Sequence, residues 1–170
     1  MMKNLFIRIK NNKKAFSILE IMAATTVITL GLTSLITLTI QSIKIQNSNK
    51  NELIASQLAQ EGVELIRNAR DMNWYLDKSW SDNLNNGSYV IDYTKTNNPV
   101  SVTGLNDINT KLFVNGSGFY NHTTGTSTIF RRMVSIAKNT AFTTITSTVR
   151  YAEGTNTKNY SVSSILYDWK

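Results

Sequence analysis

The chain opens with a basic segment that meets a long apolar run, and this junction limits what the whole chain can fold into. Residues 15–40 form about 26 positions whose only charged side chain is Glu20, and a helix needs about 20 residues to cross a hydrocarbon core. We therefore predict a transmembrane helix over residues 16–40, surrounded by the lipid bilayer. A carboxylate within such a helix costs about 2–3 kcal/mol on insertion scales, so Glu20 indicates a partner or a function. The alternative is a glutamate tolerated at the membrane interface.

The segment before the apolar run predicts how the helix is oriented. Residues 1–14 contain no acid, and the positive-inside rule therefore predicts a cytoplasmic N-terminus and an extracytoplasmic C-terminal part. An ordinary secretory signal peptide has a shorter apolar region, of about 7–15 residues, and ends in an A-x-A-like site, which residues 37–42 (TLTIQS) do not supply. We predict a basic leader over residues 1–15 and a single-pass protein of the cytoplasmic (inner) membrane. The basic residues are Lys3, Arg8, Lys10, Lys13 and Lys14.

The net charge of +7 suggests at first a nucleic-acid or anionic-membrane partner. Five of the positive charges lie in the leader, however, and without it the chain carries +2. The basicity is therefore mainly a targeting signal, and a nucleic-acid partner is not expected. The chain has no cysteine and one histidine, which excludes disulfides and zinc sites built from the usual nitrogen and sulfur ligands. We expect no metal and no cofactor.

The sequence KKAFSILE at residues 13–20, followed by the uninterrupted apolar run, resembles the type IV pilins and the pseudopilins of type II secretion and DNA uptake. The resemblance covers about the first quarter of the chain. It implies that prepilin peptidase removes the leader between Ala15 and Phe16, that Phe16 becomes an N-methylated terminus, and that Glu20 is the carboxylate used in subunit assembly. The family strongly prefers glycine where this chain has Ala15.

The resemblance also implies the partners. These are other pilin or pseudopilin subunits, the peptidase, and a membrane assembly platform with a separate ATPase, since the chain has no phosphate-binding P-loop of its own. Glu20 would pair with the N-terminal ammonium of a neighbouring subunit, because leaving either charge unpaired in an apolar helix bundle costs several kcal/mol. The assembled filament would lie at the cell surface or in the cell envelope.

Residues 41–73 predict an amphipathic continuation of the same helix. Small and apolar residues follow one another there at alternating spacings of three and four, which is one face of a helix. Residues 47–51 (NSNKN) are a weak spot at which the helix could bend or fray, and Gly62 would be tolerated if a strand or helix must approach closely. An isolated coiled coil would need more heptads than the pattern supplies. We predict that the following residues pack on a sheet: Ala55, Leu58, Gly62, Leu65, Ala69 and Met72.

Residues 74–170 alternate short apolar runs with clusters of Asn and Gly, which predicts an extracytoplasmic β-rich domain. The predicted fold class is therefore α+β, a long N-terminal helix packed on a C-terminal antiparallel sheet, as in pilins. Residues 58–74 (LAQEGVELIRNARDMNW) on the helix, together with the closing strand pair at residues 146–154 and 160–169, resemble minor pilins or pseudopilins of the pilus-modification type. Gly154 is expected in the turn between the last two strands. The candidate strands are residues 88–93, 99–103, 111–114, 129–136, 142–151 and 159–169.

Signals for catalysis are weak, and we expect no enzyme. His122 lies in a Gly/Thr-rich turn and is interpreted as a solvated loop residue, and no G-x-S-x-G nucleophile elbow occurs. Arg131 and Arg132 should face opposite sides of a strand as ordinary sheet surface. The principal interpretation is a structural, minor subunit of a pilus-like or secretion filament. The alternatives are a DNA-uptake pilin, for which Phe130, Arg131 and Arg132 are the one hint, and a membrane-tethered extracytoplasmic enzyme.

Overall fold

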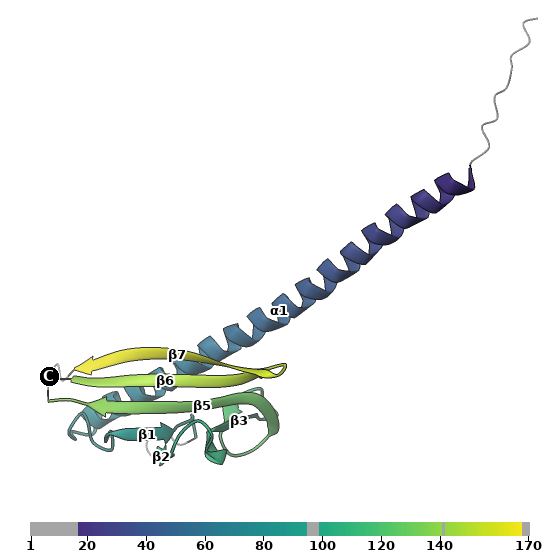
Figure 1. The fold of residues 1–170 in the computed structure, drawn as a ribbon. Helices are drawn as coiled ribbons and strands as arrows, with labels where there is room; N and C mark the ends of the chain where they lie inside the picture. The colour runs from purple at the N-terminus through teal and green to yellow at the C-terminus, as the bar shows by residue number, and fades with distance from the viewer. Residues whose placement is uncertain (1–16, 95–98, 141, 168–170) are drawn as a thin grey trace, which may run out of the picture. The chain divides into compact units, whose positions relative to one another are not determined.

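A single long helix and one antiparallel sheet make up the protein, as shown by a computed structural model that describes residues 17–94, 99–140 and 142–167 (Figure 1). The predicted α+β class is confirmed. The chain divides into two compact units, Met1–Ile45 and Gln46–Lys170, and the helix passes from the first into the second. The elements are α1 (Ile18–Tyr75), β1 (Gly87–Val90), β2 (Val100–Ser101), the 3-10 turn η1 (Ile108–Thr110), β3 (Lys111–Val114), β4 (Tyr120–Asn121), β5 (Thr126–Lys138), β6 (Phe142–Glu153) and β7 (Asn156–Tyr167).

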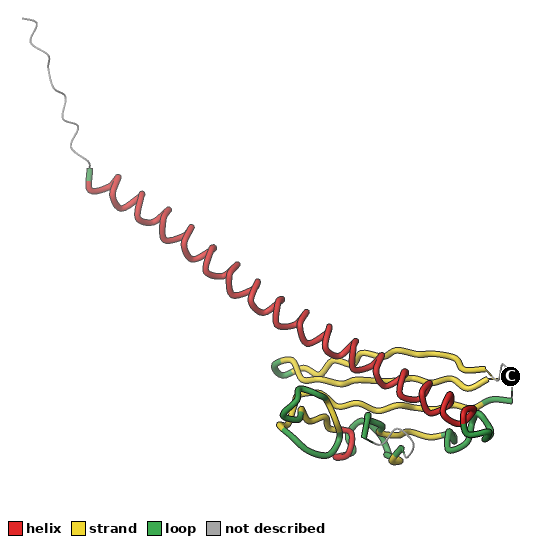
Figure 2. Tube along the Cα trace, turned by 180° about the vertical axis from the view of Figure 1, so that it is seen from behind, coloured by secondary structure: helices red, strands yellow, loops and turns green. Residues whose placement is uncertain are grey.

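The helix α1 is 58 residues long and contains no proline. It stays helical through residues 47–51, where the sequence suggested a bend or frayed turns. The helix ends at Tyr75 rather than at residue 73. The part of α1 that lies in the second unit packs against one face of the sheet, as the view from behind shows (Figure 2).

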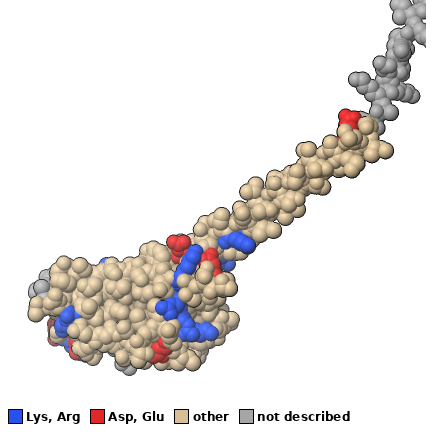
Figure 3. Space-filling model, in the orientation of Figure 1, with Lys and Arg blue, Asp and Glu red and all other residues tan. Residues whose placement is uncertain are grey.

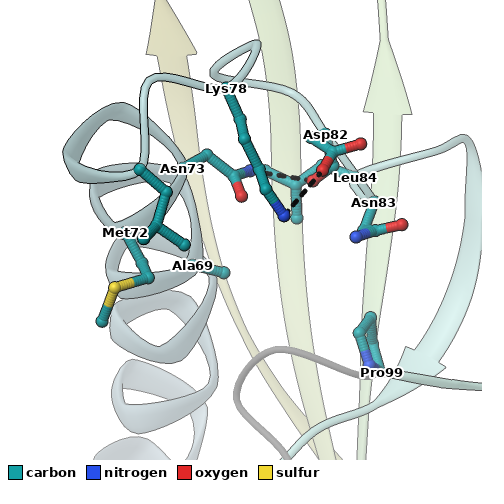
Figure 4. Close-up of a pocket in the computed structure, with 9 residues that line it drawn as sticks. Ala69, Met72, Asn73, Lys78, Asp82, Asn83, Leu84 and Pro99 are labelled. Carbon is teal, nitrogen blue, oxygen red and sulfur yellow. Dashed lines mark hydrogen bonds and ion pairs between the residues drawn. The ribbon is translucent and has the colours of Figure 1, made fainter.

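Asn73 ties the turn that follows α1 back to the helix (Figure 4). Its side-chain amide donates to the backbone carbonyls of Trp80, at 3.2 Å, and Asp82, at 2.8 Å. Asp77 adopts a positive φ of 54°, and the Lys78 N–H donates to the Asn73 carbonyl at 2.9 Å. A left-handed residue followed by this backward bond is the Schellman cap, which satisfies carbonyls at a helix C-terminus. The end of α1 is therefore determined by residues 73–78 themselves, through this cap.

The sheet is built around β5, and every strand pair in it is antiparallel. On one side β5 pairs with β6 along most of its length, and β6 pairs with β7. On the other side two short strands share β5, with β3 pairing near its start and β1 near its end. β4 pairs with β3, and β2 pairs with β1.

Each of the six predicted segments overlaps a strand, and residues 111–114 coincide with β3, whereas β5 and β6 extend beyond the predicted 129–136 and 142–151. The segment 88–93 was predicted too long, because β1 ends before Asp92, whose carboxylate accepts the Thr94 N–H at 2.9 Å and forms a local turn. The segment 99–103 contains only the two residues of β2, and β4 was not predicted.

The long hairpin of β6 and β7 was predicted with its turn in the right place. Glu153 pairs with Asn156, and Gly154 between them has a positive φ of 61°. A two-residue hairpin turn needs such a conformation, which glycine adopts without steric cost. The end of the segment predicted as 159–169 lies partly outside the described residues.

Side chains alternate between the two faces of the long strands, and the inward face forms the core with α1. The buried apolar residues make two clusters along this face. One contains Val63, Ile66, Ala69, Leu84, Ile91, Val134, Ile136, Ile145 and Leu166. The other contains Ala55, Leu58, Ala59, Leu112, Phe130, Val149 and Tyr151.

Candidate functional site

The sequence-predicted assembly site lies at the start of the chain. Ala15 and Phe16 fall outside the described residues, so cleavage and methylation there remain predictions. Glu20 lies in the first turn of α1, where it is exposed, and its N–H donates to the Ser17 carbonyl at 3.0 Å. A carboxylate in the first turn interacts favourably with the positive end of the helix dipole. The position therefore suits an anion without requiring a partner within the chain.

The hydroxyl groups in the apolar part of α1 are hydrogen-bonded within the helix. Its Ser and Thr side chains donate to backbone carbonyls three or four residues earlier, at 2.7–3.0 Å, and a polar group in lipid needs such a partner. No charged residue lies between Glu20 and Lys44, and Figure 3 shows this stretch as an uncharged surface. The bonded residues are Thr25, Thr26, Thr29, Thr33, Ser34, Thr37 and Thr39.

The described part of the chain has one helix that is long and apolar enough to cross a membrane, and it lies near the N-terminus. This fits a single-pass membrane protein. The orientation of the helix remains a prediction from the basic residues of the leader.

The predicted packing face of α1 is placed partly as expected. Ala55, Leu58, Gly62 and Ala69 are buried, and Leu65 is half-buried against the core. Met72 was predicted in this face but is 38 % exposed. The buried face also includes the residues Ala59, Val63, Ile66 and Asn73.

The error at Met72 follows from helix geometry. The predicted set repeats every 3.5 residues on average, whereas a straight helix has 3.6 residues per turn, so the set drifts by about 20° per heptad. Over the distance from Ala55 to Met72 the drift reaches roughly 50°. By the last turn the face in contact with the sheet has passed to Asn73, and Met72 lines a cavity of about 100 Å³ at the end of the helix (Figure 4).

Gly62 marks the closest approach of α1 to the sheet. A Cβ atom placed on it would lie 2.4 Å from Ser147 Oγ and 3.2 Å from Val134 Cγ2, both closer than ordinary van der Waals contact. The expectation that a strand approaches this glycine closely is confirmed, and the strands are β5 and β6. A larger residue would push the helix away from them.

Arg132 was predicted as ordinary sheet surface, and this was wrong. The side chain is fully buried beneath α1, where Nη1 donates to the Leu58 carbonyl at 3.1 Å and Nη2 to the Ile91 carbonyl at 2.8 Å. Nη1 also lies 3.0 Å from Glu61 Oε2. The guanidinium therefore joins α1, β5 and the segment after β1.

The sequence contained a signal for this burial. Arg132 shares its side of β5 with Phe130, Val134 and Ile136, all of them buried, and alternate residues of a strand face the same side. The three residues Phe130, Arg131 and Arg132 do not form one surface, because Phe130 and Arg132 are buried while Arg131 lies on the opposite face of β5.

His122 and Asp92 form a second polar group near Arg132. The Asp92 carboxylate accepts a hydrogen bond from the backbone N–H of His122 at 2.8 Å. Burial raises the pKa of Asp92, but the hydrogen bonds from Thr94 and His122 outweigh it, so the pKa is lowered. Burial, followed by repulsion from Arg132, lowers the pKa of His122 to about 4. The interpretation of His122 as a solvated loop residue was therefore wrong, since it is largely buried and neutral at pH 7.

A pocket of about 320 Å³ opens beside this network, with aromatic walls. The rings of Tyr93 and Phe119 lie 5.9 Å apart between centroids, and Glu61, already paired with Arg132, contributes the one carboxylate of the lining. Within the described residues no three His, Asp or Glu side chains are grouped as metal ligands. The pocket offers contact surface rather than a set of converging acid and base groups.

No family model, no curated protein and no solved structure matches the chain.

The functional argument therefore depends on this chain's own residues. An apolar N-terminal helix that continues onto an antiparallel sheet is compatible with the pilin-like architecture expected from KKAFSILE. Glu20 is the one predicted assembly residue that the structure describes, and it is exposed on the apolar helix rather than engaged in the core.

Proposed function

We propose that the chain is a minor structural subunit of a type IV pilus-like or type II secretion filament, assembled through its N-terminal helix. The observation that carries the proposal is the sequence KKAFSILE at the start of an uncharged helix of membrane-spanning length, with Glu20 in its first turn. The architecture supports it, because the same helix continues onto an antiparallel sheet.

The proposed chemistry is charge pairing in an apolar helix bundle. Removal of the leader between Ala15 and Phe16 creates a new α-ammonium group on Phe16, and methylation leaves it cationic. Glu20 of a neighbouring subunit supplies the anion. An unpaired buried charge costs about 3–5 kcal/mol, so pairing fixes the register between subunits.

The remaining partners follow from the same proposal. Prepilin peptidase processes the chain, and a membrane platform with a separate ATPase extracts it from the bilayer into the filament. The chain itself has no catalytic role, its N-terminus starts in the cytoplasm, and residues 74–170 are extracytoplasmic. Replacing Ala15 by Gly should speed leader removal, and a bulky residue there should stop it.

The test compares Glu20→Gln with Glu64→Gln in cells that assemble the filament. Glu20→Gln keeps the size of the side chain and removes its charge, and Glu64, exposed on α1 and paired only with Arg67, is the matched control. We expect both variants to enter the membrane and to be processed, and only Glu20→Gln to be lost from the sheared filament fraction. Incorporation of Glu20→Gln at the wild-type frequency during co-expression would refute the pairing role.

A further inference from the structure

Three basic side chains lie in register across the outer face of the sheet. Lys111 of β3 pairs with Arg131 of β5, and Arg131 pairs on its other side with Arg150 of β6. Arg150 in turn pairs with Asn159 of β7. Directly paired residues project from the same face, and neighbouring strands are about 4.8 Å apart. These residues therefore lie side by side on three neighbouring strands, and we call them the cationic row (Lys111, Arg131 and Arg150).

None of the three side chains of the cationic row forms an ion pair within the described residues. The five ion pairs found there involve other basic side chains. Like charges placed directly opposite each other destabilise a sheet, so the row lowers the stability of the domain. A feature of this kind indicates an anionic ligand.

Neutral acceptors hold the two guanidinium groups in place. Arg131 Nη1 donates to the Asp107 backbone carbonyl at 3.0 Å. Arg150 donates through Nη1 to Asn106 Oδ1, at 2.7 Å, and through Nε to Asn159 Oδ1, at 3.0 Å. Each guanidinium is thus positioned by the segment before η1 while keeping its full charge and further N–H donors, and a fixed fork of donors suits the oxygens of a phosphate.

Asp107 lies against Arg131 but, within the described structure, forms no ion pair with the row. Asp107 directs its carboxylate to the N–H groups of Asn109, at 3.0 Å, and Thr103, at 3.4 Å. These hydrogen bonds, that of the Asn109 N–H first, lower the pKa of Asp107. Asp107 therefore stays ionised, and its negative charge lies beside the row although only its backbone carbonyl bonds Arg131.

The surface beside the row is rich in hydroxyl groups. The next pairs along β6 and β7 are Thr148 with Ser161 and Thr146 with Ser163, with oxygens 3.0 Å and 2.9 Å apart. Figure 3 shows Lys and Arg atoms gathered in one band on this face, toward the end of the sheet where β6 and β7 join, with Asp and Glu atoms near both ends of the band. The row itself has no aromatic side chain on which a nucleic-acid base could stack.

We infer that the cationic row binds successive phosphates of an extended phosphodiester polymer, held through its backbone and not through its bases. Charge complementarity favours this ligand. A single small anion would use one or two of the cations, whereas three cations on neighbouring strands can together contact several phosphates of one chain. The inference does not depend on filament assembly.

The experiment uses the full chain in neutral detergent and measures binding of fluorescein-labelled oligo(dT) of 20 nucleotides and of an abasic oligonucleotide of the same length. Three phosphate contacts on a single strand should give a slope of about −2 for log K against log salt. The double variant Arg131→Gln with Arg150→Gln removes two of the three phosphate contacts. If the contribution of these contacts to binding vanishes at 1 M salt, the affinity at 50 mM salt should fall roughly 50-fold. Lys111→Gln, whose side chain has no hydrogen bond in the described structure, should lower the slope by about 0.7. It should leave the melting temperature unchanged or raise it slightly, because Lys111 and Arg131 are like charges opposite each other.

The charge-matched control is Lys78→Gln with Lys138→Gln, which lies outside the row and should keep the wild-type affinity. We expect equal binding of the two oligonucleotides and a loss confined to row variants. Equal loss in the control, or no loss in Lys111→Gln, would overturn the assignment of the row. A strong preference for the base-bearing strand would overturn backbone recognition. Co-flotation with phosphatidylglycerol vesicles in the absence of oligonucleotide binding would assign the row to a membrane surface instead.

Discussion

Replacing Gly62 by Ala tests how closely α1 packs on the sheet. The new methyl group would lie 2.4 Å from Ser147 Oγ, 3.1 Å from Ser147 Cβ and 3.2 Å from Val134 Cγ2. Ser147 Oγ is itself buried without a hydrogen-bond partner in the described structure. The substitution therefore adds volume where none is free, and its nearest obstacle is a hydroxyl whose removal should be favourable.

Two opposing terms set the expected size of the effect. Alanine improves helix propensity over glycine by about 1 kcal/mol, whereas overpacking a core costs about 1–3 kcal/mol. We expect Gly62→Ala to lower the free energy of unfolding by about 0–2 kcal/mol. Ser147→Ala alone should raise it by about 1 kcal/mol, because an unsatisfied buried hydroxyl is removed. In that background Gly62→Ala should become neutral or stabilising, which gives a coupling of about 1–2 kcal/mol.

The assay is thermal unfolding of the full chain in neutral detergent, followed by near-ultraviolet circular dichroism of the tryptophans. A change of 1 kcal/mol corresponds to roughly 3–6 °C in melting temperature. Gly31→Ala in the same helix is the control, since a Cβ there meets nothing within 4 Å, and it should not lower the melting temperature. Equal effects of Gly62→Ala with Ser147 present and absent would refute the proposed contact.

Three further outcomes follow from the core and its polar network. Leu58→Asp should unfold the domain, because Leu58 is 3 % exposed and the new charge would be unpaired. Leu65→Asp should lower the free energy of unfolding by less. An unchanged melting temperature in both variants would show that this face of α1 is not buried. Glu61→Gln should destabilise by about 3–5 kcal/mol, since it leaves the buried Arg132 guanidinium without its anion. Arg132→Met should also lower the melting temperature, because the Leu58 and Ile91 carbonyls lose their donor. The pKa of His122 is lowered from 6.5 to about 4, so the unfolded chain binds the proton more tightly than the folded chain. The contribution of His122 to the free energy of unfolding is complete above pH 6.5. It should fall by about 2–3 kcal/mol as the pH drops to 4. His122→Gln should flatten denaturant-unfolding free energies across this pH window, and an unchanged slope would contradict the burial of the ring.

The sequence predicted the elements whose signals are local. The apolar run, the absence of proline and the alternation in residues 111–114 and 142–151 each depend on neighbours in the chain, and the structure has a helix or strand at each place. Gly154 is of the same kind, because a two-residue turn is determined by its own residues. The fold class followed from these elements together.

The errors arose where a long-range partner decides the outcome. Arg132 looks like a surface residue until Glu61, the Leu58 carbonyl and the Ile91 carbonyl are brought around it by three different segments. Met72 was predicted in the packing face but is exposed, because the contact face rotates gradually around the helix. Counting residues in heptads does not include this rotation.

The cationic row is a further case, because Lys111, Arg131 and Arg150 are far apart in the chain. Only the register of β3, β5 and β6 places them side by side. A sequence reader sees Arg131 beside Arg132 and interprets the pair together, although alternation sends the two side chains to opposite faces.

The most direct test of the proposed function is the intact mass of the chain recovered from sheared surface or envelope filaments of cells with active prepilin peptidase. The account predicts a chain that begins at Phe16 and carries one methyl group on its terminal nitrogen, present in the filament fraction together with other subunits. Recovery of the chain only from the membrane fraction, with Met1 still at its terminus, would contradict it.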